Sequence, residues 1–226
     1  MRPPERRLAF AAALGLGLVL AVVVAAAGIR LEVGIPGLRI VHRIAASLEV
    51  LVVLWLGWMA WRRPAVLAAF ALTALLSVVG IMAGREPPPV AVAVNLLGGL
   101  SLAAVFAWIL GRSKSSPKRA RSLIPILLLI ALQLGLGASL SIAERSSTVL
   151  PVHGLLAVAL VAGLAWLALA RIGGATGKAL FALALAAPLA GFTALHYEYS
   201  AAAALVHAAA AAALLASTAY ALGRFA

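Results

Sequence analysis

The sequence contains no cysteine and no aspartate. The absence of cysteine excludes disulfides, thiolate metal sites, iron–sulfur clusters and covalent c-type heme attachment. It does not identify the cellular compartment. Chemistry must therefore come from the few polar side chains that interrupt a strongly apolar chain, and four of these are histidines.

Charge is also scarce: only 11% of the 226 residues are charged, whereas 65% are hydrophobic. Soluble domains carry roughly 25% charged residues, so the composition excludes a soluble domain with a polar surface. Apolar runs recur along the whole sequence, each long enough to cross about 30 Å of hydrocarbon. The sequence thus predicts an integral protein of the lipid bilayer, in which the net charge of +12 indicates topology rather than a nucleic-acid partner.

We predict an all-α fold, because only helices satisfy their own backbone within lipid without closing a barrel. Breaks in the apolar pattern divide the chain into eight transmembrane helices at about 7–29, 40–61, 64–84, 90–111, 122–143, 151–171, 177–196 and 200–223. The positive-inside rule makes both termini cytoplasmic in a multi-pass protein of the cell (plasma) membrane. The segments on that side hold 13 of the 18 basic residues: Arg2, Arg6, Arg7, Arg62, Arg63, Arg112, Lys114, Lys118, Arg119, Arg121, Arg171, Lys178 and Arg224.

The chain resembles one unit written twice, with the basic loop 111–122 between the copies. His42 and His153 open the second and sixth helices, at matching places in the two halves. The interval from His42 to Asn95 is almost the same as the interval from His153 to His207. Four helices in each half give both halves the same orientation, which predicts two parallel four-helix-bundle repeats, residues 1–113 and 114–226.

All four histidines fall on the predicted extracytoplasmic side: His42, His153, His196 and His207. Ionisable groups within a membrane usually face the bundle interior and indicate function. His153 and His207 come from helices separated by one hairpin, so they can face each other across a bundle core. Two neutral imidazoles on facing helices are the arrangement that holds a heme iron axially, with the flat macrocycle between the helices. The alternative is two buried histidines bonded to backbone or hydroxyl groups.

In the first half His42 has Asn95 at the partner position, and an amide is a poor ligand for heme iron. This site is expected to be at most singly ligated, with a coordination position left for a substrate or an exchangeable heme. The alternative is a decayed site in which Asn95 only bonds between helices. Glu49 lies two turns after His42 on the same helix face, where it is either a proton-exchanging acid or a neutral acid bonded to a neighbouring helix.

Four segments carry a resemblance to the heme A synthase family, the membrane enzymes that oxidise a methyl group of heme O to a formyl group. They are "VHRIAASLEV" (41–50), "LQLGLGASLSI" (132–142), "REPPPVAVAVNLLGGL" (85–100) and "AALVHAAAAAAL" (203–214). The family is similar in having eight helices in two repeats, with histidines near the outer ends of the even-numbered helices. The resemblance covers nearly the whole chain.

The resemblance implies that His153 and His207 hold a resident heme b, and that His42 ligates the heme O substrate. Arg39 and Arg43 flank His42 and are candidates for binding heme propionates or for pairing with Glu32; the alternative is that they only anchor the helix at the membrane interface. Three departures stand out in the first half: Asn95 replaces a histidine, the outer loop lacks the cysteine pair of some members, and Arg39 stands where a catalytic acid is expected. Glu32 and Glu49 are the candidate replacements for that acid.

The leading hypothesis is therefore a heme A synthase-like membrane oxidoreductase with heme b as cofactor, a prenylated heme as substrate, and both heme sites toward the extracytoplasmic side. Heme O synthase or a terminal oxidase would be its partners, and a homo-oligomer is left open. A noncatalytic b-type cytochrome that passes electrons between quinol and a partner complex is the runner-up. A heme chaperone, an assembly subunit or a transporter built from parallel repeats is the third hypothesis.

Overall fold

The computed structural model describes residues 3–84, 87–114, 123–142, 148–197 and 200–225. The described residues are helical and contain no strand. Eight of the helices are long and apolar enough to cross a membrane, which confirms the predicted all-α class and its number of spans. The helices are α1 (Pro3–Arg30), α2 (Leu38–Ala60), α3 (Pro64–Ala83), α4 (Pro89–Arg112), α5 (Leu123–Ile142), α6 (Val149–Trp166), which continues as the π-helix η1 (Leu167–Ile172), α7 (Gly174–His196) and α8 (Ala201–Phe225).

Local sequence signals explain several helix ends. Pro64 and Pro89 lie in the first turns of α3 and α4, where a missing N–H costs no hydrogen bond. Gly37 precedes α2 with φ 78°, a left-handed conformation that favours glycine. The predicted ends at 122 and 143, and residues 115–122 of the basic loop, lie outside the described residues.

The sixth span ends differently from the prediction. Its last six residues form η1 instead of continuing the α-helix, and the N–H of Gly173 donates to the carbonyl of Ala168 at 2.9 Å, five residues back. Such widened turns have no reliable signal in hydropathy, because the apolar pattern of the segment is unchanged.

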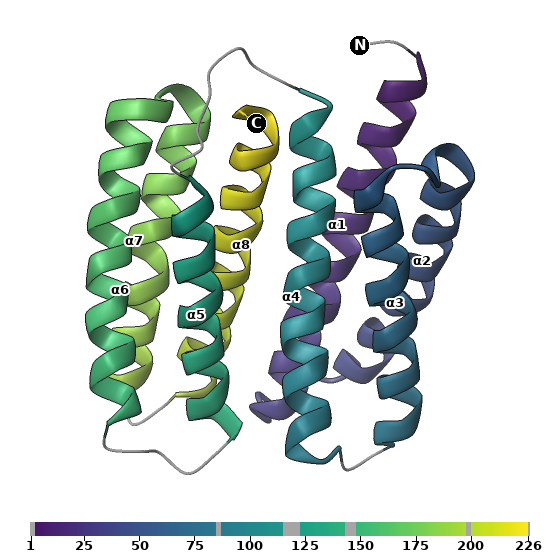
Figure 1. Cartoon of the computed structure of the whole chain (residues 1–226). Helices are drawn as coiled ribbons and strands as arrows, with labels where there is room; N and C mark the ends of the chain where they lie inside the picture. Colours follow the sequence, from purple (N-terminus) through teal and green to yellow (C-terminus); the bar gives the residue numbers. More distant parts are fainter. Residues whose placement is uncertain (1–2, 85–86, 115–122, 143–147, 198–199, 226) are drawn as a thin grey trace.

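The helices gather as two groups of four, α1–α4 and α5–α8, with the two ends of the chain toward the same end of the molecule (Figure 1). In the first group α1 packs on α2 and α4, and α3 packs on the same two helices. The second group repeats this order, since α5 and α7 both pack on α6 and α8. In the described part of the chain, no Cα atoms of α2 and α4, or of α6 and α8, approach within 8 Å. Each of these pairs is therefore diagonal in its bundle.

The two groups meet mainly through α4 and α8. A Cβ added at Gly111 of α4 would overlap the carbonyl of Tyr220, and one added at Gly223 of α8 would overlap the carbonyl of Trp108. The contact is reciprocal, because Trp108 precedes Tyr220 by the same interval as Gly111 precedes Gly223. Only glycine permits helix backbones to approach this closely.

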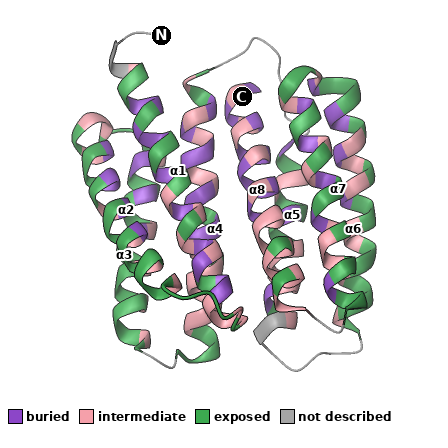
Figure 2. Cartoon of the chain, turned by 180° about the vertical axis from the view of Figure 1, so that it is seen from behind, coloured by how far each residue is buried: buried purple, intermediate pink, exposed green. Residues whose placement is uncertain are grey.

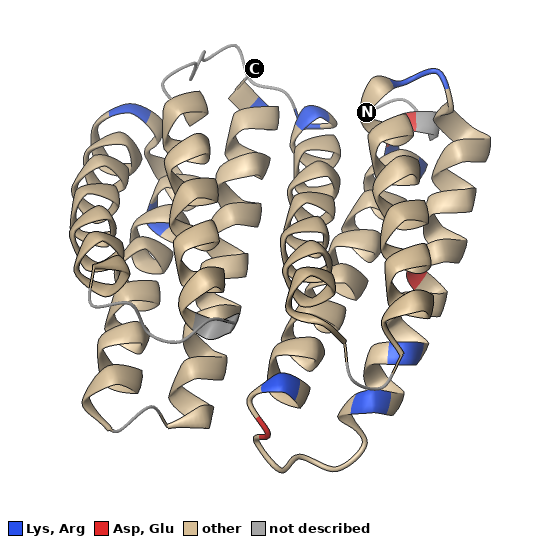
Figure 3. Ribbon diagram, turned by 60° about the horizontal axis from the view of Figure 1, so that its bottom comes forward, with Lys and Arg blue, Asp and Glu red and all other residues tan. Residues whose placement is uncertain are grey.

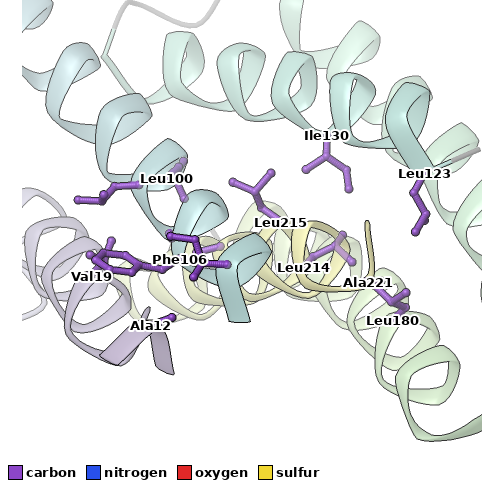
Figure 4. Close-up of a cluster of buried hydrophobic side chains, with 14 of the residues drawn as sticks. Ala12, Val19, Leu100, Phe106, Leu123, Ile130, Leu180, Leu214, Leu215 and Ala221 are labelled. Atoms are coloured by element: carbon purple, nitrogen blue, oxygen red, sulfur yellow. The ribbon is translucent and has the colours of Figure 1, made fainter. Parts of the chain in front are cut away.

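Apolar side chains fill the contact between the groups and also cover the outside of the molecule. Phe106 and Leu102 are almost fully buried and join a cluster that continues through Leu215 and Leu180 into the second group (Figure 4). The outward faces are exposed (Figure 2), yet they carry large apolar residues such as Trp58, which is 88% exposed. Lys and Arg gather toward the helix ends (Figure 3). An apolar exterior with charged ends is typical of a protein whose solvent is the bilayer.

Candidate functional site

The structure brings His153 of α6 and His207 of α8 together. Their ring centroids are 6.3 Å apart, and the ring planes are inclined by 80°. Because α6 and α8 are diagonal in the bundle, the two imidazoles meet across its core. A metal–imidazole bond is about 2 Å long, so two imidazoles on opposite sides of one ion have ring centres about 6 Å apart. The observed separation matches that requirement.

The His207 imidazole is oriented by the backbone of α7. Its Nδ1 lies 2.7 Å from the carbonyl oxygen of Ala187. A carbonyl only accepts, so Nδ1 carries the proton and donates, and this leaves the lone pair of Nε2 free for a ligand. A ring nitrogen that donates to a carbonyl is the usual support of a metal-ligating histidine.

The His153 imidazole is contacted by Gln133 of α5. The Gln133 amide nitrogen donates to the backbone carbonyl of His153 at 2.9 Å and lies 3.3 Å from the His153 Nε2. Two atoms at this contact are buried and have no hydrogen-bond partner: Nδ1 of His153 and Oε1 of Gln133. Buried polar atoms without partners are rare in native proteins and point to a missing ligand or a different ring orientation.

Glycines make room for both rings. A Cβ at Gly137 of α5 would lie 3.2 Å from Cε1 of His153, and a Cβ at Gly191 of α7 would lie 2.9 Å from Nδ1 of His207. Each glycine is one helical turn from the group that bonds its histidine, Gln133 on α5 and Ala187 on α7. All four helices of the second bundle therefore contribute to the site.

This set of residues fits a b-type heme. The described residues include no cluster of three or more His, Cys, Asp or Glu side chains able to hold a metal ion. Two facing imidazoles are suited to a metal whose other ligands arrive with it, as the four nitrogens of a porphyrin do. The buried Nδ1 of His153, which has no partner among the described residues, agrees with a site built around a further group.

The first bundle has no equivalent pair of rings among its described residues. His42 and Asn95 are both half-buried and lie on the diagonal helices α2 and α4. The structure records no hydrogen bond or ring contact between them within the described part of the chain. The prediction of a site with one histidine ligand in this half remains a prediction.

Glu49 is buried inside the first bundle, with 6% of its surface exposed. The Thr73 hydroxyl of α3 donates to its Oε1 at 2.8 Å. This bond is the arrangement expected of the second interpretation of Glu49, a neutral acid bonded to a neighbouring helix. Proton exchange between Glu49 and a substrate stays a prediction.

The three other predicted residues lie at the end of the bundle where α1 connects to α2. Arg39 and Arg43 are exposed, and so is Glu32, whose φ of 52° lies in the left-handed region. Glu32 and Arg39 line an open hollow of ≈ 380 Å³ together with Gly28, Gly37 and Ile40. No bound group is needed to explain these positions, so their roles in binding heme propionates or in catalysis stay predictions.

His196, the remaining histidine, is the last residue of α7. It stacks on Phe192 of its own helix, with centroids 6.1 Å apart and planes inclined by 9°, and it is exposed. It therefore offers a matched control for substitutions of the other histidines.

No family model and no curated protein matches the chain. The class that fold and site define is an eight-helix membrane protein with a histidine pair across its second bundle. Sequence reasoning missed the supports of that pair. Gln133 could have been recognised, because it is the only glutamine of the chain and lies in the segment 132–142 that carries the resemblance. Ala187, Gly137 and Gly191 have no polar side chain that could have indicated a role.

Proposed function

We propose that this protein is a heme-binding membrane oxidoreductase of the heme A synthase type. His153 and His207 hold a b-type heme in the second bundle, and His42 binds a prenylated heme in the first, where a methyl group is oxidised toward a formyl group. The single observation that carries the proposal is the histidine pair with ring centroids 6.3 Å apart. When bound, the heme supplies a redox-active iron whose potential depends on its axial ligands and their hydrogen bonds.

The residues of the second bundle would bind the heme and orient the two imidazoles that ligate it. The Ala187 carbonyl holds the proton of His207 at Nδ1, so that Nε2 is the ligand atom. Gly137 and Gly191 leave space beside the rings, and the surrounding apolar helices exclude water.

In the first bundle His42 supplies one ligand, and the amide at Asn95 leaves the opposite side free for an exchangeable heme. Thr73 donates to Oε1 of Glu49, so a proton carried by this carboxyl group is placed at Oε2. Glu49 is the better placed of the two candidate acids, because it is buried two turns below His42 whereas Glu32 is exposed.

A parallel repeat underlies the proposal. The same order of neighbouring helices in both groups supports it, as does the reciprocal contact of α4 with α8 through equivalent positions of the two halves. We further propose that the termini are cytoplasmic and that both histidine sites lie toward the outer face of the plasma membrane. Heme O synthase or a terminal oxidase would then be met within the same membrane.

A second candidate is a noncatalytic b-type cytochrome. Two observations favour it: among the described residues only the second bundle brings two histidines together, and Arg39 stands where the resemblance leads us to expect a catalytic acid. The cytochrome would use the second bundle alone and keep the first as scaffold.

Pigment analysis and turnover distinguish the two candidates. The purified protein is extracted and its hemes are identified by pyridine-hemochrome spectra and mass; added heme O is then followed by chromatography in the presence of a reductant and oxygen. The synthase predicts heme b together with heme O or its hydroxylated and formyl derivatives, and conversion that is lost in His42→Ala but kept in His196→Ala. Reversible reduction of heme b with no conversion would support the cytochrome, and no heme after reconstitution would refute both.

A further inference from the structure

The contact between Gln133 and His153 is incomplete in a specific way. The amide nitrogen of Gln133 donates to the backbone carbonyl of His153 at 2.9 Å, and its second N–H is within hydrogen-bond distance of Nε2 of the ring at 3.3 Å, which accepts when the ring proton is on Nδ1. Meanwhile Oε1 of Gln133 is a buried acceptor without a donor, and Nδ1 of His153 is buried without any partner. Among the described residues, Gln133 thus leaves an acceptor unused and His153 leaves one ring nitrogen unused.

Amide orientation alone does not repair the contact. Exchanging the oxygen and nitrogen of Gln133 would place an acceptor against the His153 carbonyl, which also only accepts, and would break the 2.9 Å bond. The amide nitrogen therefore stays on the carbonyl. The freedom that remains lies in the imidazole, whose rotation about the Cβ–Cγ bond is soft.

The His207 ring has a hydrogen-bond partner for its Nδ1, which the His153 ring lacks among the described residues. Its Nδ1 donates to an oxygen of the neighbouring helix at 2.7 Å, and its Nε2 is left as the ligand atom. If His153 adopts the same pattern, its Nδ1–H donates to the Oε1 of Gln133. The two buried unpartnered atoms then satisfy each other, and Nε2 leaves the amide nitrogen and becomes available.

We propose that Gln133 is the positioning residue of His153: its amide N–H holds the backbone carbonyl of His153, and its Oε1 accepts the Nδ1 proton when Nε2 serves as a ligand. This rests on the proposed heme site of the second bundle, which it deepens. Gln133 does not touch the iron; it fixes the tautomer and the direction of the ring that does. The bond also raises the basicity of the imidazole, so it influences the reduction potential.

Two substitutions separate the donor function of the Gln133 amide from its acceptor function. Gln133→Glu keeps an acceptor, now charged, for Nδ1–H and loses the donor to the carbonyl. Gln133→Leu has similar size and loses both. Ser139→Ala is the control on the same helix, because the Ser139 hydroxyl is exposed and bonds only the carbonyl of Leu136.

With heme bound, Gln133→Leu is expected to lower heme affinity about 10- to 100-fold, the usual effect of losing the partner of a ligating histidine. Its reduction potential should rise, whereas that of Gln133→Glu should fall, and Ser139→Ala should leave both quantities unchanged. Equal potentials and affinities in all four proteins would overturn the proposal.

A second readout does not depend on heme. In the ligand-free protein with ¹⁵N-labelled histidine, the nitrogen shifts of His153, assigned by His153→Ala, report which ring nitrogen carries the proton. The population with a protonated Nδ1 should fall in Gln133→Leu and rise in Gln133→Glu. If no preparation binds heme but these shifts respond, the heme site is wrong and the positioning role stands. Unchanged shifts together with unchanged potentials would reject that role.

Discussion

The two bundles share an order of helices but differ in what lies on their diagonals. Across the second bundle two imidazoles face each other, each contacted by a neighbouring helix. In the first bundle His42 and Asn95 lie on the diagonal helices, with no contact recorded between their side chains in the described part of the chain, and the buried polar contact is the bond between Glu49 of α2 and Thr73 of the adjacent α3. Under the proposed function, the second bundle would hold a heme from two sides and keep it. The first bundle would hold a heme from one side and could exchange it.

The supports differ as well as the ligands. Val22 precedes Gln133 by the same interval that separates His42 from His153, and its side chain has no hydrogen-bonding group. His42 therefore lacks the amide that contacts the ring in the second half. The asymmetry extends over the neighbouring helices and is not confined to the change from histidine to Asn95.

The largest expected effect comes from removing one imidazole of the pair. His153→Ala or His207→Ala should abolish tightly bound heme b, because a single remaining ligand no longer fixes the iron from both sides. His42→Ala should leave the heme b spectrum intact. Absorption spectra of the reduced proteins test this, with His196→Ala as control; a spectrum that persists in both alanine variants of the pair would remove the distinction between the bundles.

The reverse experiment is to give the first bundle the missing ligand. Asn95→His should create a second facing pair with His42 and raise the heme content from about one toward two per chain. A heme held by two histidines in the first bundle should no longer exchange. Any conversion of heme O should therefore fall while the amount of bound heme increases. Heme-to-protein ratios measure this outcome. An unchanged ratio would show that the supporting helices, rather than the ligand alone, separate the two bundles.

A smaller effect is expected from filling the space beside the rings. Gly191→Ala and Gly137→Ala place a methyl group against His207 and His153, so heme affinity should fall several-fold as the imidazoles are displaced. Gly135→Ala lies on the same helix as Gly137 and meets no atom within 4 Å, so it should be neutral or slightly stabilising. Heme titration of the three variants provides the comparison. Equal losses in all three would indicate a helix effect and not a site effect.

The smallest effect is expected in the first bundle. Thr73→Val removes the hydroxyl that bonds Glu49 while keeping the shape of the side chain, and should destabilise the protein by about 0.6 kcal/mol, the usual value of an interhelical hydrogen bond in a membrane. Unfolding in mixed micelles measures it. Thr193→Val is the control, because its hydroxyl bonds only its own helix. Heme b should be unaffected by either change.

The sequence was sufficient for the helices because membrane spans need long apolar runs, and such runs are visible without tertiary information. The predicted 40–61 and the observed Leu38–Ala60 differ slightly at the start, where the left-handed Gly37 sets the first turn. The π-helical η1 was not predictable, since its apolar pattern is the same as that of an α-helix.

Part of the candidate site was also predictable from the sequence, and part was not. The facing of His153 and His207 followed from their spacing and from the return of the chain through one hairpin. The acceptor for His207 is the backbone carbonyl of Ala187, and the amide nitrogen of Gln133 reaches His153 only because α5 packs on α6. Thr73 was equally hidden, because a threonine in an apolar helix usually bonds its own backbone. Contacts between helices depend on packing that hydropathy does not encode.

The glycine contact between α4 and α8 has a mechanical consequence. Asn95 precedes Gly111 by the same interval as His207 precedes Gly223, so each diagonal site lies about 24 Å along its helix from the joint. The joint has no slack, because backbone meets backbone there, while the far ends of both helices are free of that constraint. A substitution that forces α4 and α8 apart at this contact is therefore expected to displace helices of both bundles together, because each of the two helices belongs to one bundle.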